Sequence, residues 1–140
     1  MENNYQNLDV YKVSKELIHL VYQLLKGFPI EEKFALCDQI RRAVISIPAN
    51  IAEGMGRTST KEQKHFLEIS YGSLMEVQCH LDISKELGYI SKEEYEAAKS
   101  KLMKESINVF YNAYKKLSQK DKDAIVDTVE VYLVLLDATM

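Results

Sequence analysis

Two groups of side chains in this chain have residue types and spacings that could do chemistry. The first joins carboxylates to imidazoles: Glu62 and His65 form a Glu-x-x-His pair, and Glu76 and His80 stand four residues apart on one helix face. Di-iron bundles need two Glu-x-x-His pairs and further carboxylates on facing helices. Because a second such pair is absent and both histidines stand next to polar residues, we expect solvated histidines and no metal site.

The second group is cationic. Two arginines lie in tandem in one predicted helix, and three further cations gather around the start of the next helix, where the backbone amides and the helix dipole also attract phosphate. We expect this group to contact RNA or a partner protein; the alternative is that these are surface cations, some paired with Glu31, Glu53 or Glu62. The candidate residues are Arg41, Arg42, Arg57, Lys61 and Lys64, with Lys12 and Lys15 on the preceding helix as further cations.

Signatures of catalysis are missing from the sequence. The run Gly54-Met55-Gly56 precedes a helix, but it lacks the preceding strand and the third glycine of a dinucleotide-binding loop. Serine, cysteine and histidine occur without the local motifs that accompany a nucleophile, although triad partners can be distant in sequence. We therefore expect a protein that is not an enzyme and holds no cofactor.

Charge is distributed unevenly along the 140 residues, which are most simply one domain with a net charge of -3. The last 22 residues hold two lysines and five acidic residues, which leaves 16 charges of each sign in residues 1–118. A strongly basic nucleic-acid-binding protein would not have this balance, but a local basic patch is compatible with it.

Features of targeting and of thiol chemistry point to the cytoplasm. No apolar run reaches the roughly 18 residues that span a membrane, and MENNYQNLDV lacks the basic and apolar regions of a signal peptide. Cys37 and Cys79 both fall on apolar helix faces, where a thiol is usually a small core residue. We predict a reduced, cytoplasmic protein with no membrane contact.

Apolar residues recur at steps of three and four over four segments, at about 9–26, 30–54, 60–87 and 92–117. The connections are short, so neighbouring helices should be antiparallel. The prediction is an all-α protein whose residues 1–118 form an up-down-up-down four-helix bundle. Residues 119–140 form an acidic and apolar extension, predicted to be helical although VEVYLVLL also suits a strand, which packs on the bundle or on another subunit.

Individual residues fix the predicted helix ends and buried faces. Asp9 is the expected N-cap of the first helix, Ser59 and Ser91 open capping boxes, and Gly88 closes the third helix. The third buried stripe is predicted to run through Phe66, Ser70, Ser73, Val77, Leu81 and Ser84, with Leu67 and Leu74 beside it. The fourth is predicted to run through Tyr95, Ala98, Leu102, Val109 and Ala113, with Phe110, Tyr114 and Leu117 beside it.

The stretch SIPANIAEGMGRTS interrupts the helical pattern at residues 46–59. Pro48 lies inside the second apolar stripe, so we expect a bend there and a Val44 carbonyl without its usual partner. The side chains of Asn50 and Glu53 would satisfy freed backbone groups. Gly54 would form a left-handed helix end, and Gly56 would let the chain reverse. These five residues form the predicted structural motif.

Four stretches of the sequence together resemble a known family. LDVYKVSKELIHLVYQLLKGFP, QIRRAVISIPANIAEGMGR, KEQKHFLEISYGSLMEVQCHL and LGYIS resemble, over about residues 8–117, the bacterial four-helix bundle protein family, which includes proteins encoded by intervening sequences in large-subunit ribosomal RNA genes. The resemblance implies a ring-like homopentamer and no established enzymatic activity. It also implies kinship with the accessory variability determinant of diversity-generating retroelements, which partners a reverse transcriptase and nucleic acid.

The motif of that family can be carried over only at matching positions. Arg41, Arg42 and Arg57 match its basic positions, and Asn50 and Glu53 match its polar ones.

Self-association is also predicted from the residues themselves. Ser70, Gly72 and Ser73 would allow close approach of a helix, and Gly72 costs about 1 kcal/mol relative to alanine in a helix. One four-helix core cannot bury every large residue of the first and fourth helices, such as Leu20, Tyr22, Tyr111 and Tyr114. We expect a non-catalytic homo-oligomeric scaffold that binds RNA or an RNA-handling protein. The alternative is a protein-binding adaptor that docks through residues 119–140.

Overall fold

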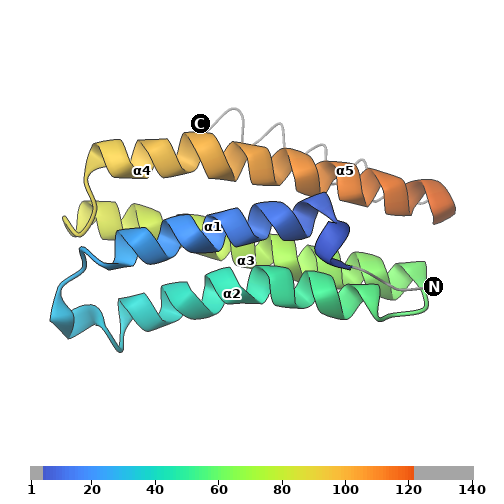
Figure 1. Ribbon diagram of the computed structural model, residues 1–140, viewed down its shortest axis with the longest axis horizontal. Coiled ribbons are helices and arrows are strands. Elements are labelled where there is room, and N and C mark those ends of the chain that lie inside the picture. Colours follow the sequence, from blue (N-terminus) through green and yellow to red (C-terminus); the bar gives the residue numbers. More distant parts are fainter. Residues whose placement is uncertain (1–4, 122–140) are drawn as a thin grey trace.

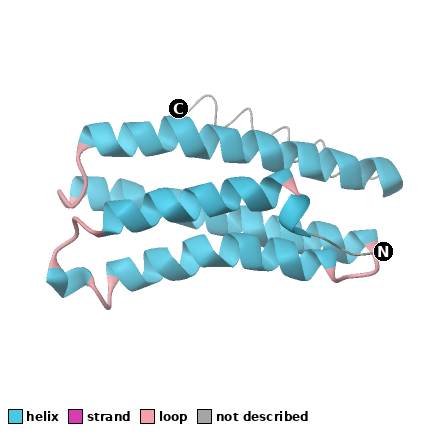
Figure 2. Ribbon diagram, viewed as in Figure 1, coloured by secondary structure: helices cyan, strands magenta, loops and turns pink. Residues whose placement is uncertain are grey.

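The computed structural model of the protein describes residues 5–121, which contain helices and no strand (Figure 2). The long helices are α1 (Asp9–Leu25), α2 (Leu36–Met55) and α3 (Thr60–Glu86). A fourth rod consists of α4 (Lys92–Ala98), the π-helical segment η3 (Lys99–Met103) and α5 (Lys104–Asp121). Short 3-10 turns, η1 (Tyr5–Asn7) and η2 (Ile30–Glu32), precede α1 and α2.

The four rods lie side by side, and each packs on its neighbours in chain order (Figure 1). Helix α1 contacts α2 and α5, α2 contacts α3, and α3 contacts both α4 and α5. The ring of neighbours closes between the first rod and the last, which is the topology of an up-down-up-down bundle. The predicted fold is therefore confirmed. Helix α5 runs to Asp121, past the predicted boundary at 118, and the predicted C-terminal helix lies outside the described residues.

The buried face of α1 follows the predicted pattern, and that of α3 follows it at four of the six stripe positions, Ser70, Val77, Leu81 and Ser84. Leu67, Ser70, Leu74, Val77, Leu81 and Ser84 are the centre of the α3 face. Phe66 and Ser73, which we predicted to be central, are only partly buried. Serines are tolerated at the centre because their hydroxyls have partners: Ser70 donates to the Ile47 carbonyl at 2.8 Å and Ser84 to the His80 carbonyl at 2.7 Å.

Helix α2 begins at Leu36 and not near residue 30 as predicted. One carboxylate explains the difference. Glu32 accepts a hydrogen bond from the Leu36 amide at 3.1 Å and another from the Tyr89 hydroxyl at 3.1 Å. Because Tyr89 follows α3, this interaction fixes the connection between α1 and α2 from across the bundle, and no local sequence pattern announces it. Phe34, within the connection, is 84% exposed.

The fourth rod contains a π-helical segment that the sequence pattern did not predict. A π turn adds a residue to the helical repeat, and so rotates the residues after it relative to those before it. Tyr95, Ala98 and Leu102 are buried as predicted, but beyond η3 the buried positions are Ile107, Phe110 and Tyr114, while Val109 and Ala113 are only partly buried. Tyr114 is 3% exposed, so it belongs to the core and not to the surplus we predicted for an interface.

The helix ends agree in part with the predicted signals. Leu8, and not Asp9, is the N-cap of α1, and Asp9 lies in the first turn. Ser59 accepts a hydrogen bond from the Glu62 amide, and the box at Ser91 is fully formed with Glu94. Gly88, with φ of 81°, closes α3 as predicted.

The stretch around Pro48 remains helical to Met55. Asn50 donates from Nδ2 to the Ser46 carbonyl at 2.8 Å, not to the Val44 carbonyl that Pro48 frees. Gly54 is buried inside α2 and is not a left-handed helix end, and Gly56 is the C-cap with φ of -81°. The role of Gly54 is close packing: a Cβ atom there would lie 2.9 Å from Cβ of Phe66.

The two cysteines differ from each other. Cys37 is buried at the start of α2, as predicted, and burial raises the pKa of its thiol. Cys79 is exposed on α3, which corrects the prediction of a second core thiol. The apolar residues around Cys79 include Ile83, which is itself 40% exposed. Among residues 5–121, no helix is both long and apolar enough for a membrane span.

Candidate nucleic-acid interface

A shallow hollow lies on the surface between α1 and α2. It is lined by Tyr22 of α1 and by Arg41, Arg42, Ile45 and Ser46 of α2. Tyr22 is 39% exposed and Ile45 is 44% exposed, so an aromatic and an aliphatic side chain face solvent beside two guanidinium groups. We call these five residues the α1–α2 patch.

The two arginines of the patch are held differently. Arg41 donates from Nη2 to the Lys33 carbonyl at 2.6 Å, which ties the start of α2 to the preceding turn. Arg42 forms an ion pair from Nε to Oδ2 of Asp38 at 3.1 Å, with its side chain 80% exposed. An exposed pair of this kind is worth little, about 0–1 kcal/mol, so Arg42 can exchange its partner for a phosphate.

Helix α1 extends the patch with further cations. Lys15, His19, Tyr22 and Lys26 are all exposed and recur at steps of four, three and four, which places them on one face of α1. The Lys15 ammonium lies 5.6 Å from the centre of the Tyr11 ring. Tyr22 belongs to both this row and the patch, so the basic surface continues from one helix to the other.

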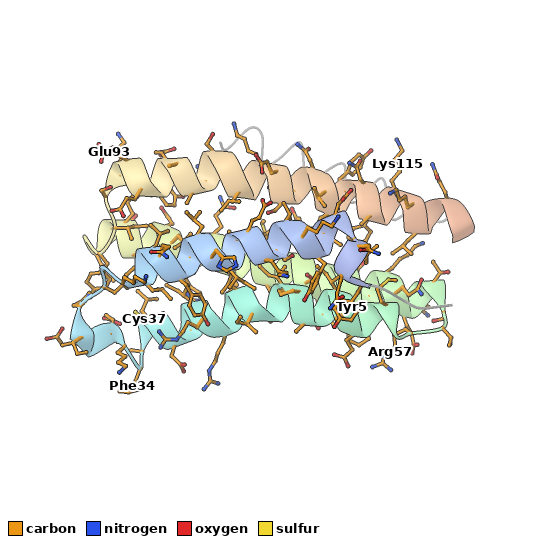
Figure 3. All side chains as sticks on the ribbon, viewed as in Figure 1. Tyr5, Phe34, Cys37, Arg57, Glu93 and Lys115 are labelled. Atoms are coloured by element: carbon orange, nitrogen blue, oxygen red, sulfur yellow. The ribbon has the colours of Figure 1, made fainter. Side chains whose placement is uncertain are left out.

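The other predicted cations lie at the opposite end of α2. Figure 3 shows Arg57 at the end of the bundle away from Phe34 and Cys37. A helix rises about 1.5 Å per residue, so the α-carbons of Arg41 and Arg57 are roughly 20 Å or more apart. The five predicted residues therefore form two groups and not a single site.

The side chain of Arg57 is engaged within the chain. Its Nη2 lies 3.2 Å from Oε1 of Glu53, and its guanidinium lies 4.7 Å from the centre of the Phe66 ring. The Arg57 carbonyl accepts a hydrogen bond from Nε2 of Gln63 at 3.0 Å. Arg57 and Glu53 thus hold the turn between α2 and α3, and Lys61 is the exposed cation beside them.

Lys64 is not part of an exposed cationic surface. Only 2% of it is exposed, because it lies on the buried face of α3, three residues before Leu67. This position corrects its predicted place among the exposed candidates. Lys61 and Lys64 are close in sequence, but Lys61 is exposed and Lys64 is buried.

The two histidine and carboxylate pairs, Glu62 with His65 and Glu76 with His80, lie on α3. Within the part of the chain that the structure describes, no group of three or more potential ligands among His, Cys, Asp and Glu converges. His65 is exposed, as expected. His80 is not the solvated side chain we predicted, since it is 13% exposed and its Nε2 lies 3.2 Å from Oε1 of Glu76.

Ile45 is the patch residue that sequence reasoning did not single out. The available signal was its position: it is an aliphatic residue one step off the stripe of Val44 and Ile47, in register with Arg42 on the outward face of α2. An exposed isoleucine next to tandem arginines indicates a contact surface more strongly than the arginines alone.

The fold and the sequence together define the class of protein. Residues 6–112 match the family model of the 23S rRNA-intervening sequence protein, and the chain belongs to that family. A crystal structure of a protein with unknown function from the S23 ribosomal protein family of Bacteroides thetaiotaomicron VPI-5482 is similar to it, with a TM-score of 0.62 and 27% sequence identity over 81% of this chain and 99% of that one. No curated protein sequence matches the chain.

The match confirms the resemblance inferred from the four sequence stretches. The kinship with the accessory determinant of retroelements stays a prediction.

Proposed function

We propose that the protein is a non-catalytic, self-associating scaffold that binds RNA through the α1–α2 patch. The observation that carries the proposal is the exposure of Tyr22 and Ile45 beside Arg41 and Arg42. Unpaired bases stack on aromatic rings and on guanidinium planes, and arginine also binds phosphate through two parallel hydrogen bonds. The family's description as a 23S rRNA-intervening sequence protein agrees with an RNA partner.

The electrostatics favour modest, sequence-tolerant binding. The chain has a net charge of -3, so attraction to RNA is local to the patch and the α1 row. If two to four phosphates are contacted, log K should fall with log salt at a slope of about -1.5 to -3 for single-stranded RNA. A strongly basic protein would show a much steeper slope.

Self-association would compensate for weak individual sites. Repeating one patch on every subunit converts a weak contact into an avid one when a single RNA reaches several copies. The proposed number of subunits is five, and this number rests on the family resemblance alone.

The outward face of α3 supports the self-association part of the proposal. We define the α3 outer row as Ile69, Gly72, Glu76, Cys79 and Ile83, which recur at steps of three and four. Ile69 is 39% exposed and Ile83 is 40% exposed. A Cβ atom at Gly72 would meet nothing within 4 Å, so no packing inside the chain calls for a glycine there. Close approach of another copy would account for both features.

The RNA assignment is tested by comparing two double variants. Arg41→Ala/Arg42→Ala removes two cations from the patch, and Lys92→Ala/Lys104→Ala removes two exposed cations from the fourth rod. Anisotropy of a labelled single-stranded RNA at low salt should show affinity reduced about tenfold or more by the first change, since each phosphate contact adds to the salt-dependent term. The second change should have little effect, and circular dichroism should show both variants folded.

Equal RNA affinity of the two variants would contradict the patch assignment. The predicted adaptor would be favoured if neither variant loses RNA binding and if the chain captures a partner protein only when residues 119–140 are present. A triple variant, Arg41→Ala/Arg42→Ala/Arg57→Ala, separates the two cation groups, because only its third change lies at the far end of α2.

A further inference from the structure

A groove opens at the end of the bundle where α2 meets α3. It lies between the start of α1, the end of α2, the start of α3 and the second half of α5, and it has a volume of about 380 Å³. Its apolar wall is formed by residues from all four rods: Leu8, Ile51, Met55, Leu67, Val109 and Leu117. The groove therefore reaches the edge of the core, where Ile51 and Leu67 are themselves buried.

The rim of the groove is polar but balanced in charge. Asp9 and Lys116 supply one charge of each sign, and Gln63 and Asn112 supply amides. A charged ligand would find no excess of either sign here. The apolar wall is thus the feature that an occupant has to match.

The chain itself supplies a matching segment. Helix α5 ends at Asp121, only four residues beyond Leu117 of the groove wall, and residues 122–140 follow it. Within them, AIVDTVEVYLVLL at positions 124–136 contains two charged residues among thirteen. A connection of two to eight residues is enough to reverse a chain between packed helices, and 122–123 meets that length.

The volume of the groove limits how much of residues 124–136 it can hold. A volume of 380 Å³ is at the small end of the range of about 300–1,000 Å³ seen for ligand pockets, so it holds a few side chains and not a whole helix or strand. Along α5 the wall runs from Val109 to Leu117, which is roughly 12 Å at the helical rise. A returning segment has to present one apolar face over that length.

We propose that residues 124–136 of the same chain fold back along α5 and insert one apolar face into this groove. The contact shields the most apolar stretch of the sequence, and the apolar wall of the groove, from water. Residues 122–140 carry one lysine and four acidic residues, so acidic side chains beside the inserted face would also lie near Lys116. This inference does not depend on RNA binding.

Cysteine crosslinking in the full-length chain tests the proposal. In a Cys79→Ser background, Ala113→Cys places a thiol in the groove wall, and Asn108→Cys places one on the exposed side of the same helix. Each is combined in turn with Ile125→Cys, Val129→Cys, Leu133→Cys or Leu136→Cys. Cys37 can stay because it is buried.

A docked segment should form intrachain disulfides with Ala113→Cys about tenfold faster than with Asn108→Cys, at one or two tail positions on a common face. An undocked tail samples both sides of α5 at similar effective concentration, so equal rates would overturn the proposal. Disulfides formed only between chains would also overturn it, and would assign the groove to the tail of a second copy.

Hydrogen exchange gives an independent readout that leaves the groove residues unchanged. Leu133→Asp/Leu136→Asp should speed exchange in residues 109–117 by about fivefold or more, because local opening becomes easier when apolar contacts are lost. Thr128→Asp is the matched control, since it adds a charge at a polar position. Unchanged exchange in the double variant would contradict docking, whatever the crosslinking rates.

Discussion

Gly54 of α2 packs directly against Phe66 of α3, so closely that a Cβ atom on Gly54 would stand 2.9 Å from the Phe66 Cβ. The guanidinium of Arg57 also contacts Phe66 and lies 4.7 Å from the centre of its ring. Glycine, ring and guanidinium together fix the turn from α2 to α3. The absence of a side chain at Gly54 is therefore a packing requirement between the two helices.

Gly54→Ala should destabilise the fold by about 1–3 kcal/mol, the usual cost of forcing extra atoms into a packed contact. The backbone conformation at Gly54 is helical, so alanine itself brings no strain and the clash with Phe66 decides the sign. Urea denaturation measures the effect. If the variant is as stable as the parent, α2 and α3 can move apart at this contact without loss of stability.

Gly72→Ala is the matched contrast on α3. Its Cβ would meet nothing within the chain, so the stability of the isolated subunit should rise by about 1 kcal/mol through helix propensity. If the α3 outer row packs against another copy, the same methyl group should weaken association. Analytical ultracentrifugation over a dilution series checks this, and assembly equal to that of the parent would remove the α3 outer row from the interface.

The two thiols should react at very different rates. Cys79 is exposed and should be modified quickly by a maleimide in the dilute, dissociated protein. Cys37 is buried, and its pKa is raised by that burial despite the nearby Arg41, so it should react only when the protein unfolds. Mass spectrometry of the labelled chain distinguishes the sites. Fast labelling of Cys37 in the folded protein would contradict the packing at the start of α2.

Concentration should change the reactivity of Cys79. Because Cys79 lies in the α3 outer row, association through that row would slow its modification as the protein is concentrated, while Cys37 would stay unreactive. A rate for Cys79 that is independent of concentration, in a sample shown to be oligomeric, would place the interface elsewhere.

Stability should fall at alkaline pH. The pKa of Tyr89 is raised by its hydrogen bond to the Glu32 carboxylate, and that of Tyr95 is raised by burial and then by Asp82. Because the pKa of each phenol is higher in the folded protein, the unfolded chain loses these protons first as the pH rises. The stabilisation from the two protonated phenols is therefore complete below about pH 10 and is lost as the pH rises through their folded pKa values. Denaturation at several pH values should show the fall, and Tyr89→Phe/Tyr95→Phe should flatten it.

Absorbance titration of the phenols provides the control for that prediction. Glu32→Gln removes the charge that holds the Tyr89 proton, so the Tyr89 phenol should titrate closer to its ordinary pKa. Unchanged titration in this variant would mean that the hydrogen bond between Glu32 and Tyr89 does not form in solution.

Local pattern was sufficient to predict the bundle and the buried face of α1. Val10, Ser14, Leu17, Val21 and Leu24 are buried as their spacing requires. It was insufficient where a distant group or an irregular helical turn decides the outcome. The start of α2 depends on Glu32, whose carboxylate accepts a hydrogen bond from Tyr89, a residue that follows α3. The buried face of the last rod changes direction at η3.

Of the five predicted cations, only Arg41 and Arg42 lie in the α1–α2 patch. Helix geometry separates them from Arg57 and Lys61 along α2 and turns Lys64 into the bundle. Arg41 and Arg57 stand sixteen positions apart in the sequence, which already implies a separation of roughly 20 Å or more in a helix. Burial of a lysine, in contrast, depends on the packing of neighbouring helices and follows from no short motif.

Native mass spectrometry of the full-length protein, purified at low salt from its own host, tests the central claim most directly. The account predicts a mass of several subunits, five by family resemblance, that carries additional mass removed by ribonuclease. Arg41→Ala/Arg42→Ala should keep the assembly and lose the additional mass. A monomer without bound RNA at micromolar concentration would contradict both halves of the proposed function.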